Sequence, residues 1–188
     1  MNSTPMLELD DGLALRPVVR GILPDVVEVW MEDPDAGRAA LPWIDEEGDV
    51  TRQLGALLSS IERPVDDATH FWSIHDDSGF IGLIGLDDRT IHDGSRYNLG
   101  YWVRQSHRSR GIARTSVDAI FQWLKEVMGD VRIEITVHPH NTAGLATCHA
   151  ILRKWDGVAI EGFVSVDIGP RTVPHHLHII DLTPEVVS

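Results

Sequence analysis

The sequence has one cysteine, no long apolar run and few basic residues. With Cys148 alone, the chain forms no internal disulfide, and there is no cysteine spacing typical of a zinc finger. The longest apolar stretch, GFIGLIGL, is far shorter than the roughly 20 residues that span a bilayer. The first residues, MNSTPMLELDDG, contain neither a basic nor an apolar region, so we predict no signal peptide. We expect a cytoplasmic protein without a membrane partner.

Positive charge is scarce, because 16 lysines and arginines stand against 29 aspartates and glutamates, for a net charge of -13. Proteins that bind nucleic acids carry a broad basic face, so we expect no nucleic-acid partner. The negative charge is compatible with a cationic substrate, such as an amine or a basic peptide. It equally suits a protein whose charge only keeps it in solution, and both interpretations stay open here.

Short strands and amphipathic helices alternate along the 188 residues. This length and the absence of repeats or linkers predict a single domain over residues 1–188. Alternating or short apolar runs predict strands, over residues 13–18, 70–75, 79–88, 96–103, 132–138, 158–168 and 175–182. Apolar residues at helical spacing predict helices, over residues 23–30, 50–61, 113–127 and 145–155. The order is typical of a mixed α/β (α+β) fold.

Two connections in this pattern are marked by proline. The stretch MEDPDAGRAALPW, residues 31–43, contains two prolines and predicts a loop. Pro64 is expected to end the second helix, because proline cannot continue a helical hydrogen-bond pattern.

The stretch GYWVRQSHRSRGIART, residues 100–115, concentrates positive charge between a strand and a helix. The first N–H groups of a helix lack intrahelical acceptors, and the helix dipole adds positive potential. Arg108 and Arg110 can donate charge-assisted hydrogen bonds to phosphate oxygens, and Gly111 lets a ligand approach the backbone. These features predict an anion site, for a pyrophosphate in particular. The alternative is a solvated basic turn, since the motif R-x-x-G-x-A alone is weak.

Several motifs together make the sequence similar to a known family. LGYWVRQSHRSRGIARTSVDAIFQWL, followed by RIEITVHPHNTAGLATCHA, resembles the hallmark of the GNAT acyl-CoA N-acyltransferases. More narrowly it resembles the RimJ/RimL-type subgroup, which includes N-terminal acetyltransferases of ribosomal proteins. LALRPV, LPWI, GFIGLIGL and VAIEG match further segments of that family, so the resemblance covers nearly the whole chain.

The resemblance implies a layout for the acetyl-CoA co-substrate. It implies a single GNAT-like domain with a central twisted mixed sheet of about seven strands, a splayed parallel pair and about four helices. The pantetheine arm would lie in the splay, paired with the backbone of Trp102 and Arg104, and amides of residues 108–113 would hold the pyrophosphate. The implied co-substrate-binding residues are Trp102, Val103, Arg104, Arg108, Ser109, Arg110, Gly111, Ile112, Ala113, Arg114 and Asn141.

The resemblance also implies the reaction, direct attack of a neutral amine on the thioester of acetyl-CoA. A backbone N–H near Val103 is expected to stabilise the developing oxyanion. Asp167 is the base candidate, or else it only begins a turn. Glu134 is expected to relay protons or to pair with an arginine. Trp43, in a loop, is expected to contact the acceptor, which is the amine of a protein N-terminus or of a small molecule.

The sequence departs from the family pattern in two places. Gly144 stands where the family has a serine that is a candidate proton donor, and WDGV replaces the KLGF segment. Thr142, Thr147 or Cys148 could substitute for that serine, although a small core residue is the simpler interpretation of Cys148. The departures leave two alternatives open, a non-catalytic acyl-CoA-binding module and a transferase for longer acyl chains. We expect no metal site despite ten histidines, and the resemblance makes a homodimer possible.

Overall fold

The computed structural model describes residues 4–62 and 69–183, which form two compact units. The first unit contains the described residues up to Leu86 together with Tyr101–Ser116. The second contains Asp87–Gly100 and the described residues from Val117 onward. Pro64, the residue predicted to end the second helix, lies outside the described residues.

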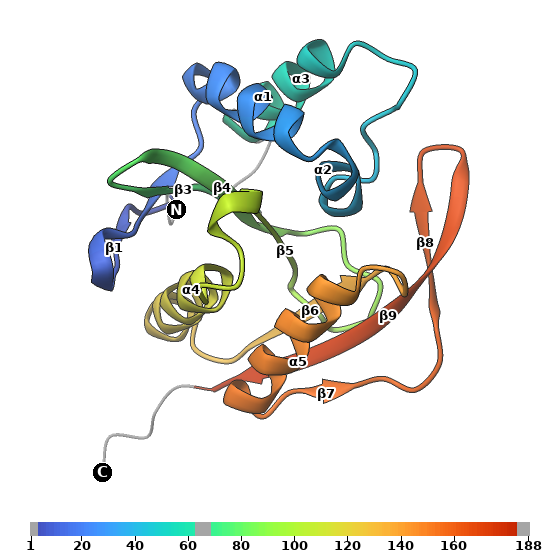
Figure 1. The fold of residues 1–188 in the computed structure, drawn as a ribbon. Coiled ribbons are helices and arrows are strands. Elements are labelled where there is room, and N and C mark those ends of the chain that lie inside the picture. The colour runs from blue at the N-terminus through green and yellow to red at the C-terminus, as the bar shows by residue number, and fades with distance from the viewer. Residues whose placement is uncertain (1–3, 63–68, 184–188) are drawn as a thin grey trace. The chain divides into compact units, whose positions relative to one another are not determined.

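The strands of the first unit follow one another as antiparallel neighbours (Figure 1). These segments are rich in apolar residues, and β4 is buried without a break from Phe80 to Leu86, so a continuous apolar run rather than alternation marks this strand. The hairpin predicted from the DDSG turn is confirmed, with Asp76 paired to Gly79. The four strands are β1 (Leu7–Glu8), β2 (Ala14–Pro17), β3 (His70–Asp76) and β4 (Gly79–Asp87).

Three helices belong to the first unit: α1 (Leu23–Glu32), α2 (Pro34–Ala40) and α3 (Val50–Glu62). The prediction of a loop over residues 31–43 is wrong for α2. Asp33 caps this helix, because its Oδ1 accepts a hydrogen bond from the N–H of Ala36 at 3.1 Å. Pro34 occupies the first turn, where its missing N–H costs nothing. A proline there indicates the start of a helix as well as a loop.

Trp30 lies at the centre of the apolar core of the first unit. Its ring meets that of Trp102 edge-to-face, with centroids 6.0 Å apart. On α2, a Cβ added to Gly37 would come within 2.6 Å of the Trp30 ring, so only glycine allows α2 to pack this closely. The buried residues of this core are Val18, Val26, Val29, Trp30, Ile44, Leu54, Leu58, Phe80, Leu83 and Trp102.

Two elements contribute residues to both units. Strand β5 (Tyr97–Val103) leaves the second unit after Gly100, and helix α4 (Ile112–Met128) leaves the first after Ser116. In the second unit, β5 pairs in parallel with β6 (Val131–Val137) through Tyr97–Ile133 and Asn98–Glu134. The register ends at Asn98, so Leu99 and Gly100 do not continue the parallel ladder.

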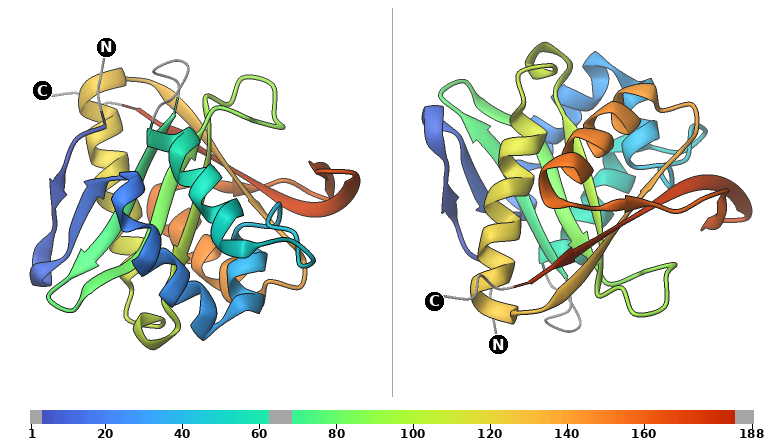
Figure 2. Two further views of the ribbon diagram at one scale, coloured as in Figure 1. Left: turned by 90° about the horizontal axis from the view of Figure 1, so that it is seen from above. Right: turned by 90° about the horizontal axis from the view of Figure 1, so that it is seen from below.

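Strand β9 (Arg171–Leu182) is the long strand of the second unit. It pairs antiparallel with β6, with β7 (Val158–Ala159) and with β8 (Val164–Ile168). The turn from β8 to β9 contains only Gly169 and Pro170, so β9 begins before the stretch predicted from the sequence. In both views of Figure 2 this hairpin, in red, extends away from the helix that precedes it.

Helix α5 (Thr142–Trp155) packs on β6 and β9 (Figure 1). Its buried stripe is Cys148, Ile151 and Leu152, and Trp155 meets Phe121 of α4 edge-to-face at 5.1 Å. The stripe follows the helical period, as the sequence indicated.

The mixed α/β fold class is confirmed. The described residues form nine strands and five α-helices rather than about seven and four, because β1 and β7 are two residues long and α2 was unexpected. Within the described part of the chain, no helix combines the length and the apolar character needed to cross a membrane.

Candidate active site

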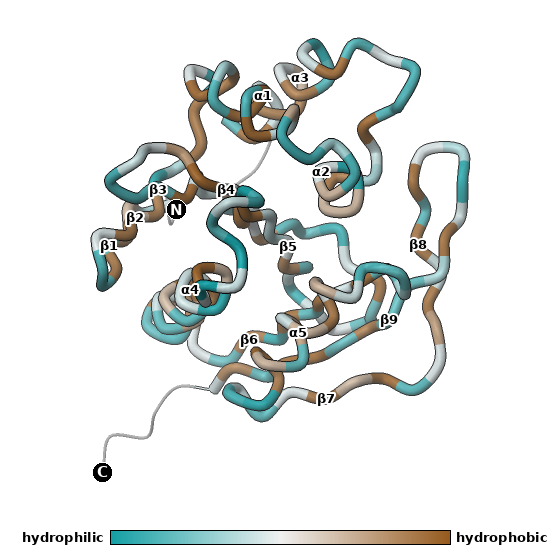
Figure 3. The backbone as a smooth tube through the Cα atoms, in the orientation of Figure 1, coloured by the Kyte–Doolittle hydropathy of each residue, from teal (hydrophilic) through white to brown (hydrophobic). Residues whose placement is uncertain are grey.

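The cationic loop before α4 belongs entirely to the first unit. After β5 ends at Val103, the chain forms a short 3-10 helix over Gln105–His107 and reaches α4 at Ile112. Two loop residues are left-handed, Ser109 at φ 62° and Gly111 at φ 80°. Left-handed backbone is uncommon for a residue with a side chain. Figure 3 shows the loop in the teal and white of polar residues.

The first amides of α4 precede the start of its internal hydrogen bonding. The N–H of Thr115 donates to the carbonyl of Gly111 at 2.9 Å, so the N–H groups of residues 111–114 have no acceptor within the helix. None of the described side chains accepts from them. Arg108 differs, since its N–H donates to the Gln105 carbonyl at 3.3 Å. The open amides therefore begin after Arg108.

Two of the four loop arginines are neutralised by acids of the first unit. Arg104 donates to Glu28 at 2.9 Å and to Glu32, which lie one turn apart on α1. Arg108 donates to Asp33 at 2.8 Å. Sequence reasoning missed these acids, although the Glu28–Glu32 spacing of four indicates a shared helix face.

The other two loop arginines, Arg110 and Arg114, are exposed and form no salt bridge with a described carboxylate. The positive charge available to a ligand therefore comes from these two side chains and from the start of the helix. The side-chain role predicted for Arg108 toward phosphate competes with its acceptors in the protein.

The backbone of β5 is fixed against β4 at Gly82. A Cβ at this position would lie 2.3 Å from the carbonyl oxygen of Trp102, which therefore faces β4. The N–H of Arg104 faces the same way and donates to Ile81 at 2.7 Å. The peptide bonds are trans, so the N–H of Val103 points away from β4. The Arg104 N–H, part of the backbone predicted to pair with pantetheine, is therefore occupied by Ile81. The pairing predicted for the backbone of Trp102 and Arg104 stays a prediction.

Trp43 lies in the segment between α2 and α3, and 47% of its surface is exposed. Its neighbour Ile44 is buried in the core of the first unit. The end of the segment is tied to α3, because Gln53 accepts from the N–H of Asp45 at 2.7 Å and donates to its carbonyl at 3.1 Å. Trp43 is thus an exposed ring on a fixed segment.

In the second unit, Asn141 caps helix α5. Its Oδ1 accepts from the N–H of Gly144 at 2.9 Å. A Cβ at Gly144 would come within 2.6 Å of the Asn141 Nδ2, so a serine here would displace the cap. The absence of a side chain at Gly144, where the sequence departs from the family pattern, therefore leaves room for the Asn141 side chain to cap α5.

Glu134, on β6, is fully buried and holds the chain that precedes β5. Its carboxylate accepts from the N–H groups of Ile91 at 2.7 Å and His92 at 2.9 Å, and from Asn98 Nδ2 at 3.3 Å. It pairs with no arginine among the described residues. These contacts give Glu134 a structural task, and its relay role stays a prediction.

Asp167 lies on β8, beside the turn into β9. It is exposed, and its Oδ1 accepts from the hydroxyl of Thr172 across the hairpin at 2.7 Å. The bond to Thr172 fits the turn interpretation, and the exposure of Asp167 leaves its role as a base a prediction.

Cys148 is a core residue, as the simpler interpretation held. It is fully buried, and burial raises the pKa of its thiol to about 12. A thiol this weak is a poor proton donor to a leaving thiolate. Several histidine rings of the second unit contact one another, such as His138 and His175 with centroids 5.5 Å apart. No group of His, Cys, Asp and Glu among the described residues has a metal-binding arrangement.

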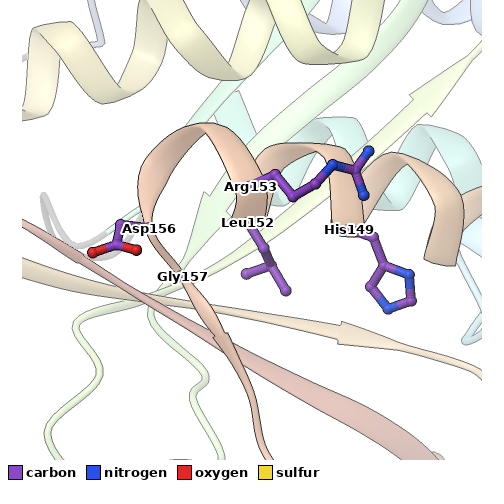
Figure 4. Close-up of a pocket in the computed structure, with 5 residues that line it drawn as sticks. All are labelled: His149, Leu152, Arg153, Asp156 and Gly157. Atoms are coloured by element: carbon purple, nitrogen blue, oxygen red, sulfur yellow. The ribbon is translucent and has the colours of Figure 1, made fainter.

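The second unit has a shallow hollow of about 390 Å³ at the end of α5 (Figure 4). Its lining residues are His149, Leu152, Arg153, Asp156 and Gly157. None of the predicted site residues lines it. The left-handed Asp156, at φ 52°, ends the helix there.

Comparison with known proteins places the chain in a family. Residues 13–150, more than half of the chain, match the family described as Acetyltransferase (GNAT) domain. This match runs through residues of both units. No curated protein matches the sequence significantly. The chain therefore belongs to the GNAT acetyltransferase family.

Solved structures of low sequence identity share the fold. RimJ of Mycobacterium smegmatis, solved with CoA-disulfide, is 21% identical with a TM-score of 0.68 over 96% of this chain and 87% of its own. A spermidine N-acetyltransferase from Vibrio cholerae, solved with CoA and spermine, is 18% identical with a TM-score of 0.66, over 92% and 97%. An acetyltransferase from Salmonella typhimurium that modifies the N-terminal serine of ribosomal protein L7/L12 is 15% identical with a TM-score of 0.66, over 94% and 98%.

Proposed function

We propose that the chain is an acetyl-CoA-dependent N-acetyltransferase that acetylates a primary amine, on a protein N-terminus or on a small molecule. The observation that carries the proposal is the run of open amides before and within the first turn of α4, next to two exposed arginines that form no salt bridge with a described carboxylate. We also propose that the two units make up one GNAT domain, since the family match includes residues of both.

The residues of the loop fit a pyrophosphate. The N–H groups of Ser109 to Ala113 would hold its oxygens, with Arg110 and Arg114 adding charge. A Cβ at Gly111 would lie 3.3 Å from the Arg114 guanidinium and would stand where the chain is left-handed. A glycine therefore keeps this approach open. Asn141, in the second unit, is proposed as a further ligand through the resemblance.

The C-terminal part of β5, beyond its register with β6, would position the reacting group. Acetyl-CoA supplies an activated acetyl thioester. The Val103 N–H, directed away from β4, is proposed to donate to the thioester oxygen as negative charge develops there. Holding thioester and amine together in attack geometry accounts for most of the expected acceleration.

The acceptor is proposed to be a cationic amine that contacts Trp43. The exposed Trp43 ring can cover an alkyl chain or a cation. The net charge of -13 attracts amines that are protonated in solution. Solved relatives of the fold act on a protein N-terminus or on spermidine, which are both amines. Asp167 is proposed to remove the proton of the attacking ammonium.

Calorimetric titration with acetyl-CoA, CoA and ADP tests the donor side. We expect binding of acetyl-CoA and CoA in the micromolar range and much weaker binding of ADP. A thiol reporter with a panel of peptides and polyamines then tests transfer. No binding of CoA would contradict the proposal at its base.

A non-catalytic acyl-CoA-binding module is the second candidate, favoured by Gly144, which offers no proton donor. Tight CoA binding without thiol release across the whole panel would support it. A thiolate is a good leaving group on its own, so we favour the enzyme. Parallel assays with propionyl-CoA and succinyl-CoA would detect a preference for longer acyl chains.

A further inference from the structure

The peptide bond between Val103 and Arg104 is held at both ends. Its N–H donates to the carbonyl of Ile81 on β4 at 2.7 Å. Its carbonyl, that of Val103, accepts from Nε of Arg108 at 2.9 Å. A peptide plane held at both ends is restricted in rotation, which fixes the chain on the C-terminal side of Val103. The Val103 N–H belongs to the preceding peptide plane, whose carbonyl, that of Trp102, lies against Gly82 of β4. The two planes together define the direction of the Val103 N–H.

The same guanidinium reaches helix α2 of the first unit. Nη1 of Arg108 donates to Oδ2 of Asp33 at 2.8 Å. The other oxygen of Asp33 accepts from Ala36 and caps α2. The hydrogen bond from Arg108 is the main reason that the pKa of Asp33 lies below its ordinary value. This carboxylate is therefore ionised at neutral pH.

These contacts form one chain from β5 to α2. We propose that Arg108 is a positioning residue that fixes the Val103 peptide and the α2 segment relative to each other, and that it does not serve as a phosphate ligand. The proposal rests on the proposed function, because it concerns the attack geometry of that reaction. The planar guanidinium presents separate donors to two acceptors, which a lysine ammonium cannot reproduce at this site.

The apolar packing beside this chain shows why a polar link is needed. Trp102 contacts Trp30, and Trp30 lies against Gly37 of α2. Apolar contacts bring α2 close but are non-directional. The two hydrogen bonds of Arg108 add a defined orientation.

The test uses four variants of the full chain. Arg108→Gln and Arg108→Lys remove or reshape the link, and Asp33→Asn removes its charge while leaving an oxygen to cap α2. Asp35→Asn is the matched control, since Asp35 lies two residues away and pairs with Arg38 at 2.8 Å. The readouts are kcat, the KM of acetyl-CoA and of the amine, the Kd of CoA, and hydrogen exchange over residues 34–40.

We expect Arg108→Gln to lower kcat about tenfold and to raise the KM of the amine, with the Kd of CoA changed less than about threefold. Arg108→Lys should not rescue kcat. Asp33→Asn should act alike, and the double variant should be no worse than the single one, because both remove the same link. Exchange over residues 34–40 should be faster in both single variants and unchanged in Asp35→Asn.

Three results overturn the proposal. Additive effects of the two substitutions would show that Arg108 and Asp33 act separately. If the Kd of CoA rises by a larger factor than kcat falls, Arg108 acts as a phosphate ligand. If Arg108→Gln keeps the wild-type exchange rates over residues 34–40 and the wild-type kinetics, Arg108 does not link β5 to α2. Failure of the proposed function is distinct, since the wild-type protein itself would then release no thiol, and the link would have no reaction to position.

Discussion

Two strand-to-helix connections of this protein, one before α4 and one before α5, solve the same problem in opposite ways. Before α5, the side chain of Asn141 accepts from the N–H of Gly144 and closes the helix start. Before α4, the left-handed Ser109 and Gly111 direct the chain so that no described side chain caps the first turn. A helix start capped by its own chain offers little to an anion, whereas an open start beside Arg110 and Arg114 offers amides and charge.

At the loop before α4, some of the many acidic residues of this protein have a definite role. An acidic protein uses three of its acids, Glu28, Glu32 and Asp33, to fix two loop arginines in position. The remaining two arginines are left for a ligand. Counting the four loop arginines from the sequence therefore gives about twice the positive charge that remains without a salt bridge at this loop.

Gly111→Val breaks the open connection and has the largest expected effect. A β-branched residue is strained at φ 80° and fills the approach to the amides, so the Kd of CoA should rise at least about a hundredfold. Calorimetry measures it. Gly162→Val is the control, because Gly162 is also left-handed, at φ 88°, with no atom near its Cβ position. Equal losses in both variants would point to general strain.

Replacing Arg110 and Arg114 with glutamine keeps the amides and removes the charge. The Kd of CoA should rise about tenfold at low salt, with a smaller change at high ionic strength because salt screens exposed charges. Titrations at two salt concentrations measure the difference. Arg89→Gln, at an exposed arginine paired with Asp87, should leave the Kd unchanged. A salt-independent loss would mean that the two side chains act by packing.

Gly144→Ser tests the closed connection. The new Cβ would displace the Asn141 side chain and cost the cap, so the free energy of unfolding should fall by about 1 kcal/mol. Denaturant titration measures it. Ala143→Ser, at the exposed neighbouring position, is the control. Unchanged stability would show that Asn141 contributes no cap.

Asp167→Asn has the smallest expected effect and lies outside both connections. If Asp167 takes the proton of the ammonium, kcat should fall by about threefold or more, with the acidic limb of the pH–rate profile altered and the Kd of CoA unchanged. Its bond with Thr172 can persist in the variant, because asparagine keeps an oxygen. Identical rates and pH–rate profiles for the wild type and Asp167→Asn would mean that Asp167 acts only in the turn between β8 and β9.

Most of the fold could be predicted because its elements follow simple periods. The apolar stripe of α5 and the alternation of apolar and polar residues in β6 can be read directly from the sequence. Helix α2 was missed because seven residues with a proline and a glycine carry no clear stripe. Its only signal was Asp33 followed by Pro34, which indicates a helix start as well as a turn.

The candidate site could be predicted only in part. The loop and Gly111 follow from local chemistry. Which amide of β5 is free depends on the register with β4, which no local pattern contains. The partners of Arg104 and Arg108 lie more than seventy positions away in sequence, so their neutralisation appears only in three dimensions.

The segment that runs from the start of α2 to the start of α3 is held at both ends, which bears on how its sequence can vary. Asp33 anchors the start through Arg108, and the Asp45–Gln53 pair anchors the end. Exposed residues between these anchors, such as Trp43, can change in identity without loss of these contacts, whereas Gly37 and Ile44 are held by the core. If the proposed function holds, substituting the exposed residues of this segment is a route to altered amine preference, because the contacts of the loop before α4 stay in place.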